Sequence, residues 1–288
     1  MRSTRMTAIA AGVVIMVAGL SACNDKGGDG DKAGGSTGGS SSTGGGGDTA
    51  GKSPLDSALA SLKQASEQTN GKQSAKVDGT TKSGTTTQTM KGAMDWSKGM
   101  NMTVDITTSG AGAMGSGKPM KALYTPDAMY MNMGMPMQGK SWIKYDYDVM
   151  AKKMGPAGSV MKDMMQNNNP GRSVDLLVAS GKVKEVGKED VRGVQATHFT
   201  GTLSVSELTR MQSKNVSEAD LKALEQQLKQ SGATTETIDL WVGSDNLLVK
   251  KREQLQGKAP YDSTVFYSDY GTKVSVTPPS PSDTFDYK

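Results

Sequence analysis

The sequence is poor in the side chains from which most enzyme sites are built. It contains one cysteine, Cys23, and one histidine, His198, and aromatic residues make up only 5% of its 288 residues. A serine–histidine–acid triad would have to use His198. The sequence matches G-x-S-x-G at 34–38 and the P-loop pattern G-x-x-x-x-G-K-S at 46–53, but both matches lie in a glycine- and serine-rich stretch with no predicted strand before them, so the strand–turn–helix context that either motif needs is missing. The acidic pair Glu189-Asp190 falls in a predicted turn, where carboxylates are ordinarily solvated. We therefore expect no catalysis and no cofactor.

The chain also lacks the charge pattern of a nucleic-acid-binding protein. Its formal net charge is only +4, and its 33 lysines and arginines are scattered along the sequence. A nucleic-acid site usually shows a basic stripe with interleaved aromatic residues, and none occurs here. We do not expect nucleic acid as a partner.

No apolar run is long enough to cross a bilayer, which takes about 20 residues in a helix. The longest run, Thr7 to Leu20, has about fourteen residues and follows two arginines, Arg2 and Arg5. A short apolar run behind a basic start is typical of a secretory signal peptide rather than a membrane span. We expect residues 1–22 to be such a signal.

The signal ends in the letters LSAC, which resemble the lipobox of bacterial lipoproteins. The resemblance implies that the Cys23 thiol carries diacylglycerol, that the signal is cut before Cys23, and that the new amino group is a further site of acylation. Two acyl chains make a durable anchor, because each buried CH₂ contributes about 0.8 kcal/mol. We expect the protein on the extracytoplasmic face of the cell membrane. The alternative is a secreted protein with an unpaired cysteine.

Residues 23–53 join this anchor to the rest of the chain. From 24 to 53 the sequence has thirty residues, of which twenty are glycine, serine or threonine. Such a segment cannot bury apolar surface, so it is predicted to be a flexible tether. Its r.m.s. span would be roughly 30 Å, so a folded part could stand clear of the headgroups and still reach back to them.

Residues 54–288 are predicted to form one folded domain in spite of an unusual apolar composition. Leucine, isoleucine, valine and phenylalanine make up only about one residue in six of this part, which on its own would suggest disorder. Methionine raises the apolar share to nearly one in four. Sixteen of the twenty methionines lie between Met90 and Met165, so the interior of this region must be built largely from thioether side chains.

Three segments have helical spacing. Ser53 as N-cap, Pro54 at the first position and an acidic third residue predict a helix over 54–69 with Gly71 as its stop and Leu55, Leu59 and Leu62 on one face. A second helix is predicted to start after Ser217, with a Val216–Leu221 contact and a stripe of Leu221, Leu224 and Leu228, and to end before Gly232. The segment 149–166 is predicted to be a helix interrupted at its Gly-Pro-Ala-Gly sequence.

Between these segments the apolar residues alternate, which predicts antiparallel strands with one buried face. Met90, Met94 and Trp96 share one parity, and Met100, Met102, Val104 and Ile106 share another such row. In the stretch MYMNMGMPM, Met129, Met131 and Met133 continue the pattern, and 134–139 is the predicted turn into the next strand. Further strands are predicted near 182–190, 194–203, 234–242, 246–256, 261–270 and 273–277. The residues expected to line the interior are Met94, Trp96, Met102, Val104, Met129, Met131, Met133, Ile143, Tyr145 and Leu240.

Several longer motifs resemble the LppX/LprG-type lipoproteins of actinobacteria. The stretches VGKEDVRGVQATHFTGTLS, TIDLWVGSDNLLVKKREQ and FYSDYGTKVSVTPPSPSDTFD match in order and spacing, and MDWSKGMNM, YTPDAMYMNM and KSWIKYD match more loosely. The chain departs from the pattern in its methionine density and in the glycine-rich insert at 109–118. The resemblance implies an α+β, LolA/LolB-like fold: a strongly curved antiparallel sheet, a half-barrel, with helices packed in its concave face around a lipid cavity.

Three functions remain open. The first is a monomeric carrier of a lipid or another lipophilic molecule, because methionine is flexible enough to repack around different acyl chains. Alternatively, each methionine simply fills a closed core that binds no ligand. The second is an envelope Cu(I)-binding protein, since thioethers are soft ligands, although His198 sits on the polar face of its strand beside Thr200 and Thr202 and offers no imidazole. The third is an interaction module for an envelope sensor or transporter.

Overall fold

The computed structural model describes residues 53–110, 117–155, 158–211, 217–230 and 232–287. The predicted signal peptide, Cys23 and nearly all of the tether lie outside these residues, as do most of the glycine-rich insert and Val216. Within the described residues no helix is both long and apolar enough to cross a membrane.

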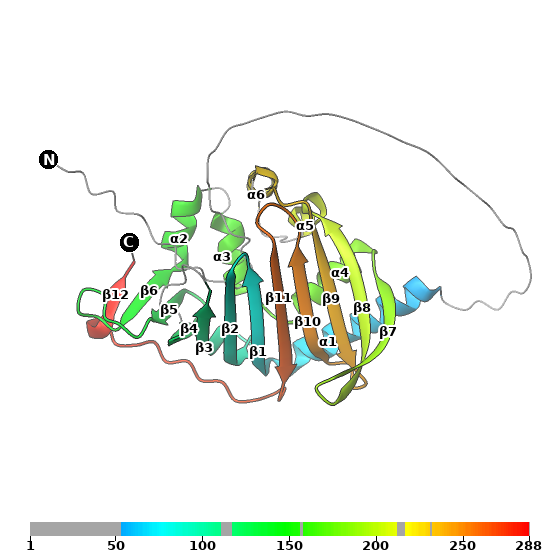
Figure 1. The fold of residues 1–288 in the computed structure, drawn as a ribbon, viewed down its shortest axis with the longest axis horizontal. Coiled ribbons are helices and arrows are strands. Elements are labelled where there is room, and N and C mark those ends of the chain that lie inside the picture. Colours follow the sequence, from blue (N-terminus) through cyan, green and yellow to red (C-terminus); the bar gives the residue numbers. More distant parts are fainter. Residues whose placement is uncertain (1–52, 111–116, 156–157, 212–216, 231, 288) are drawn as a thin grey trace, which may run out of the picture.

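One large sheet organises the molecule (Figure 1), and its strands follow the order β12-β6-β5-β4-β3-β2-β1-β11-β10-β9-β8-β7. All neighbours are antiparallel except β12 and β6. The strands are β1 (Ser74–Ser83), β2 (Thr86–Asp95), β3 (Asn101–Ser109), β4 (Pro119–Tyr124), β5 (Ala128–Asn132), β6 (Trp142–Asp146), β7 (Lys184–Val191), β8 (Val194–Ser204), β9 (Thr235–Gly243), β10 (Leu248–Leu255), β11 (Tyr261–Ser268) and β12 (Thr284–Asp286).

This order divides the sheet into two meanders. Strands β1 to β6 follow one another along the chain, strands β7 to β11 do the same, and the pair β1–β11 joins the two series. Sharp curvature has a local cause at Gly92, where a Cβ atom would lie 2.0 Å from the Thr103 carbonyl oxygen. Only glycine permits so close an approach of β2 to β3. The predicted α+β class, with a curved and mainly antiparallel sheet, is confirmed.

The helices lie on one side of this sheet (Figure 1). They are α1 (Pro54–Lys72), α2 (Tyr147–Met154), α3 (Gly158–Gln166), α4 (Gly171–Ser180), α5 (Val205–Met211) and α6 (Glu218–Gln230), with a 3-10 turn η2 (Pro281–Asp283). Helix α1 packs against α4 and β10, α4 and α5 contact β9, and α2 contacts β6. Helices α4 and α5 have no counterpart in the sequence prediction.

Helix α1 begins as predicted and ends later. Ser53 and Asp56 form a reciprocal capping box. The predicted stop at Gly71 is wrong, because the helix runs through it and ends where Gln73 adopts a left-handed φ of 64°. Leu55 is also not on the buried face, since its side chain is 41% exposed. The buried stripe starts one turn later and consists of Ala58, Leu62, Ala65, Ser66 and Thr69.

The other two helical predictions are confirmed. The segment 149–166 forms α2 and α3, and Gly155 with a φ of 62° ends the first of them. Helix α6 starts after Ser217, whose hydroxyl accepts a hydrogen bond from the Asp220 amide at 3.1 Å. Of its leucines, Leu228 packs against a small satellite core of Val205, Ala233 and Leu255.

Five of the six C-terminal strand predictions are confirmed as β7 to β11, and the strand at 273–277 is wrong. Val274 and Val276 are half-buried, so their alternation is real, but this stretch pairs with no described strand. Pro278 and Pro279 follow it and have no N–H to donate to a ladder. The chain instead runs on to η2 and β12, which pairs in parallel with β6.

The turn predicted at 134–139 is confirmed as a tight hairpin. Met137 and Lys140 exchange backbone hydrogen bonds of 2.8 and 3.0 Å, and Gln138 and Gly139 both have positive φ. Two successive positive φ values are what a type I′ hairpin turn requires. It returns the chain directly from β5 to β6.

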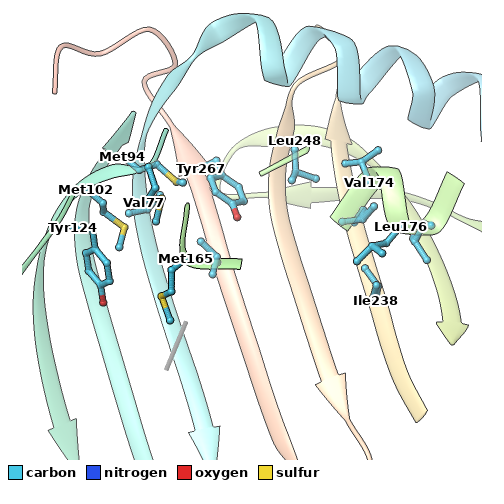
Figure 2. Close-up of a cluster of buried hydrophobic side chains, with 14 of the residues drawn as sticks. Val77, Met94, Met102, Tyr124, Met165, Val174, Leu176, Ile238, Leu248 and Tyr267 are labelled. Carbon is cyan, nitrogen blue, oxygen red and sulfur yellow. The ribbon is translucent and has the colours of Figure 1, made fainter. Parts of the chain in front are cut away.

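The core fills the space between the sheet and the helices as one continuous cluster. Figure 2 shows two kinds of packing in it: Met94, Met102, Met165 and Tyr124 lie together on one side, and Val174, Leu176, Ile238 and Leu248 on the other. The first group comes from the β1–β6 meander and helix α3, and the second from the β7–β11 meander and helix α4. The two meanders therefore bury different side chains against the same layer of helices.

Candidate functional site

The predicted wall residues are built into the core by the register of the first meander. Met94 on β2 lies opposite Met102 on β3, and Met131 on β5 lies opposite both Ala122 on β4 and Ile143 on β6. Directly opposed residues of antiparallel strands share a face. Seven predicted wall residues are buried, and three are half-buried and packed against the core. The buried ones are Met94, Met102, Val104, Met129, Met131, Ile143 and Leu240, and the others are Trp96, Met133 and Tyr145.

The five methionines of the stretch MYMNMGMPM differ in how far they are buried. Met129 and Met131 are buried and Met133 is half-buried, but Met135 and Met137 are 54% and 40% exposed. The strand ends at Asn132, so the two later methionines belong to the hairpin turn and are not held by the pleat of the sheet. Only the first half of the alternation contributes to the interior.

A small cavity lies between the first meander and the connection from α3 to α4. Its volume is about 40 Å³, and since a single water occupies at least about 10–15 Å³ by this measure, it holds roughly three waters. Its wall consists of Val77, Met90, Met94, Met100, Met102, Asn168, Asn169, Pro170, Lys251, Glu253, Ser263, Val265 and Tyr267. An acyl chain does not fit this volume, so the methionines fill the interior in this conformation.

Polar contacts hold the α3–α4 connection over this cavity. The Gln166 carbonyl accepts a hydrogen bond from the Met100 amide at 3.2 Å, and the Gln166 side chain donates to the Pro126 carbonyl at 3.0 Å. Arg172 at the start of α4 lies 3.5 Å from Asp163 on α3. Burial lowers the pKa of the Arg172 guanidinium, and the Asp163 carboxylate opposes that effect. The cover of the cavity is thus held by individual polar bonds in addition to the packing of Met165 and Val174 in the core.

Charged side chains from β10 reach the same cavity, and the sequence analysis missed them. Lys251 and Glu253 are 5% and 1% exposed, and the Lys251 ammonium lies 3.2 Å from the Glu253 carboxylate. Ser173 on α4 donates to Glu253 Oε1 at 2.6 Å and accepts from Lys251 Nζ at 3.1 Å. The three side chains form a closed triangle that joins the helix layer to the sheet.

A second buried carboxyl lies near this triangle. Glu236 on β9 is 7% exposed and accepts a hydrogen bond of 2.8 Å from the Tyr261 hydroxyl. Burial and then the neighbouring Glu253 carboxylate raise the pKa of Glu236 from its ordinary 4.5 to about 7, against smaller lowering effects of Tyr261 and Lys251. Burial likewise raises the pKa of the Tyr261 phenol. The interior of the second meander therefore contains more acidic than basic groups.

The single histidine lies away from this interior. The two ring nitrogens of His198 form hydrogen bonds with the carboxylates of Glu189 at 2.9 Å and Asp239 at 3.0 Å. The ring also stacks on Trp241, with centroids 4.2 Å apart. The prediction of a hydrogen-bonded histidine on the polar face is confirmed. The predicted turn at Glu189-Asp190 is wrong, because both residues belong to strand β7, and the Trp241 N–H lowers the pKa of Glu189 most strongly.

A metal site of ordinary oxygen and nitrogen ligands finds no support. Among the residues that the structure describes, no three His, Cys, Asp or Glu side chains come together as a group that could hold an ion. Four thioethers, from Met90, Met94, Met100 and Met102, do line the small cavity, but the Lys251 ammonium lines it as well. A cation there would lie close to that positive charge, which opposes binding, and the Glu253 carboxylate on the same wall is already paired with Lys251.

No protein-family model matches the chain. It is 44% identical over 247 residues to a Streptomyces griseus protein described as "Uncharacterized 31.2 kDa protein in rplA-rplJ intergenic region", covering 81% of this chain and 80% of that one. It is 31% identical to "Putative lipoprotein SCO4650" of Streptomyces coelicolor over 303 aligned positions, covering 99% of this chain and 96% of that one.

Among solved structures, the crystal structure of the Mycobacterium tuberculosis lipoprotein LppX is similar over 77% of this chain and 98% of that chain, with 13% identity and a TM-score of 0.48. LppX is of the type that the sequence motifs resemble. The family assignment follows from the two Streptomyces proteins, whose identity and coverage are much higher. The chain belongs to the same family as these two proteins, one of which is described as a putative lipoprotein.

Proposed function

We propose that the protein is a carrier that binds a lipid or another lipophilic molecule between its sheet and its helices. In this proposal the lipid on Cys23 holds it to the extracytoplasmic face of the cell membrane, and the domain acts as a monomer without catalysis and hands its ligand to an envelope transporter. One observation carries the proposal: methionine side chains line the helix-covered face across four neighbouring strands, β2 to β5, and continue on α3.

Ligand entry requires this interior to open, since the cavity of about 40 Å³ admits no acyl chain. Methionine supports such opening because it is unbranched and changes rotamer easily to fill irregular space. The connection over the cavity is held by separate polar bonds, such as those of Gln166, which can break and re-form with water. An acyl chain would then take the place of methionine side chains that now touch one another.

Native mass spectrometry of the mature chain tests the binding step. The chain should carry Cys23→Ala behind a secretory signal peptide whose cleavage does not need a lipobox, so that it is processed without a covalent lipid, and should be purified from its own host. We expect a population with a non-covalent lipid mass that is lost on collisional activation. A chain that carries no lipid and takes none up from vesicles would contradict the carrier and favour the interaction module.

The anchor is tested separately by fractionation of Cys23→Ala in the host. We expect the variant to leave the membrane fraction or to remain an unprocessed precursor, because the lipobox cysteine is the only residue that can be lipidated in this way. A mature-length variant that still fractionates with the membrane would contradict the lipid anchor. The folded domain should be unaffected, which a thermal melt of the purified chain would check.

A Cu(I) site is the second candidate, on the specific observation that four thioethers line one cavity. Soft thioether sulfur is a suitable ligand for Cu(I). Anaerobic Cu(I) titration against a chromophoric chelator distinguishes the two functions, with Met94→Leu as the variant. The carrier proposal predicts no stoichiometric Cu(I) binding and unchanged lipid uptake by the variant. Tight binding that Met94→Leu weakens would favour the metal site.

A further inference from the structure

The triangle of Lys251, Glu253 and Ser173 places a buried ion pair beside the methionine wall of the interior. All three side chains are more than nine-tenths buried, and Lys251 and Glu253 line the same cavity as the four methionines. Burying an ion pair costs several kcal/mol in desolvation per ion, and well-packed apolar residues in its place are often neutral or stabilising. Stability alone therefore does not account for charges at this position.

The hydrogen-bonding capacity of the triangle is not exhausted. A lysine ammonium donates three hydrogen bonds, and among the described residues Lys251 contacts two oxygens, those of Ser173 and Glu253. Asn168, Asn169 and Ser263 line the same cavity and add amide and hydroxyl groups that both donate and accept. The cavity therefore has an apolar side made of methionine and a polar side that can exchange hydrogen bonds in both directions.

The charges around the cavity select the kind of polar group that would fit. An anionic phosphate would lie beside the Glu253 carboxylate, and the one ammonium there is already paired with that carboxylate. A cationic head would meet Lys251. A hydroxyl group suits both partners, because it accepts from an ammonium and donates to a carboxylate. The volume of about 40 Å³, roughly three waters, is also that of a small polyol head.

We propose that the Lys251–Glu253–Ser173 triangle is a head-group subsite for a neutral, hydroxyl-bearing amphiphile, such as an acylglycerol, whose chains lie against the methionine wall. This rests on the proposed carrier function and names the ligand class for the same interior. Lys251 donates to the ligand hydroxyl and Glu253 accepts from it. The triangle thereby fixes which end of the ligand lies under the α3–α4 connection.

Competitive loading of the mature Cys23→Ala chain tests this inference. The probes are dioleoylglycerol, its O-methyl ether and dioleoyl phosphatidate, offered together in equal amounts from phosphatidylcholine vesicles, and the bound lipid is extracted and quantified by mass spectrometry. The three share their acyl chains and differ only at the head. We expect dioleoylglycerol to be enriched about tenfold over each of the others, because only its free hydroxyl can both accept from the ammonium and donate to the carboxylate.

The double variant Lys251→Met with Glu253→Leu removes both charges together and leaves no unpaired buried ion. We expect it to load the three probes about equally while total uptake persists. The matched control is Arg252→Met with Asp262→Leu, which removes an ion pair of 2.6 Å between β10 and the neighbouring β11, on the opposite and more exposed face of the sheet. This control should keep the tenfold enrichment.

The outcomes separate the subsite from the carrier. Wild-type chain that loads all three probes equally, or prefers phosphatidate, would overturn the subsite and leave the carrier standing. Enrichment that survives in the charge-free double variant would also overturn it. If no probe loads, the carrier itself fails, and the subsite with it. Should the double variant not fold in a thermal melt, Ser173→Ala replaces it, since it opens the triangle without stranding a charge, and its enrichment should fall at least about threefold.

Discussion

The two halves of the sheet bury the same kind of surface with different chemistry. In the β1–β6 meander the interior is methionine, with Met94, Met102 and Met131 among its buried residues, whereas in the β7–β11 meander it is Phe199, Ile238 and Leu240. The second half also carries the buried charges. Branched and aromatic side chains pack in few rotamers and make a rigid wall, while thioethers adapt to their surroundings. We therefore expect the side chains of the β7–β11 half to be rigidly packed and those of the β1–β6 half to rearrange more easily.

The largest difference should appear when a charge is placed in each half. Met131→Glu buries a carboxylate among thioethers with no cationic partner in register, and we expect it to cost at least about 4 kcal/mol in the free energy of unfolding. Ile238→Lys lies opposite Glu253 in the sheet register and two residues from Glu236, so its ammonium has carboxylates nearby and should cost less. Urea denaturation of both variants measures the difference. Equal losses would show that the second half offers no electrostatic compensation.

Truncation to alanine should separate the halves by a smaller margin. We expect Leu240→Ala to lower the free energy of unfolding by about 3–5 kcal/mol and Met131→Ala by about 2–3 kcal/mol, because the cost of a cavity falls when neighbouring side chains can move into it. Both residues are almost fully buried, so exposure does not bias the comparison. If Met131→Ala proved the costlier change, the methionine half would be the rigid one.

The buried acidic group makes the second half sensitive to pH. The pKa of Glu236 is about 7 in the folded protein and 4.5 ordinarily, so between these values the folded state binds more protons than the unfolded state. Stability from this group is therefore complete below pH 4.5 and is lost as the pH rises through 7, by about 1–3 kcal/mol. Glu236→Gln should flatten this fall and raise stability at pH 8. Melts between pH 5 and 8 test it, with the exposed Glu185→Gln as a control that should retain the slope.

The methionine half is the part that the sequence predicts well. Apolar residues occupy every second position from Met100 to Ile106, and all four are buried. In a strand with one buried face, this alternation shows directly which side chains point into the core. Met135 and Met137 keep the same spacing but fall in the predicted turn at 134–139, and both are exposed. Methionine continues at every second position through the turn. The strand, whose geometry would place these side chains on one face, ends at Asn132.

The polar subsite could not be predicted because a bulge reverses the facing of its strand. The register of β10 against β9 shifts between Leu248 and Lys250, so Leu248 and Lys251 both face the interior although they are three residues apart. Counting by twos from Leu248 would have turned Lys250 and Arg252 inward instead. One extra residue in a strand moves each following side chain to the opposite face of the sheet from the one that simple alternation predicts. A run of charged and polar residues such as KKREQ gives no sign of the bulge.

The smallest expected effect is also the one that separates the candidate functions. Met131→Leu keeps the volume and apolarity of the wall, so we expect it to cost less than about 1.5 kcal/mol and to leave lipid uptake unchanged. The reverse change in the rigid half, Leu240→Met, should cost a similar amount, though a flexible side chain there loses more rotamer freedom on burial. Thermal melts, competitive lipid loading and Cu(I) titration should be run on both. If Met131→Leu abolished Cu(I) binding but not lipid uptake, the methionine sulfur would be acting as a metal ligand. The two halves would then differ in their ability to bind metal rather than in their rigidity.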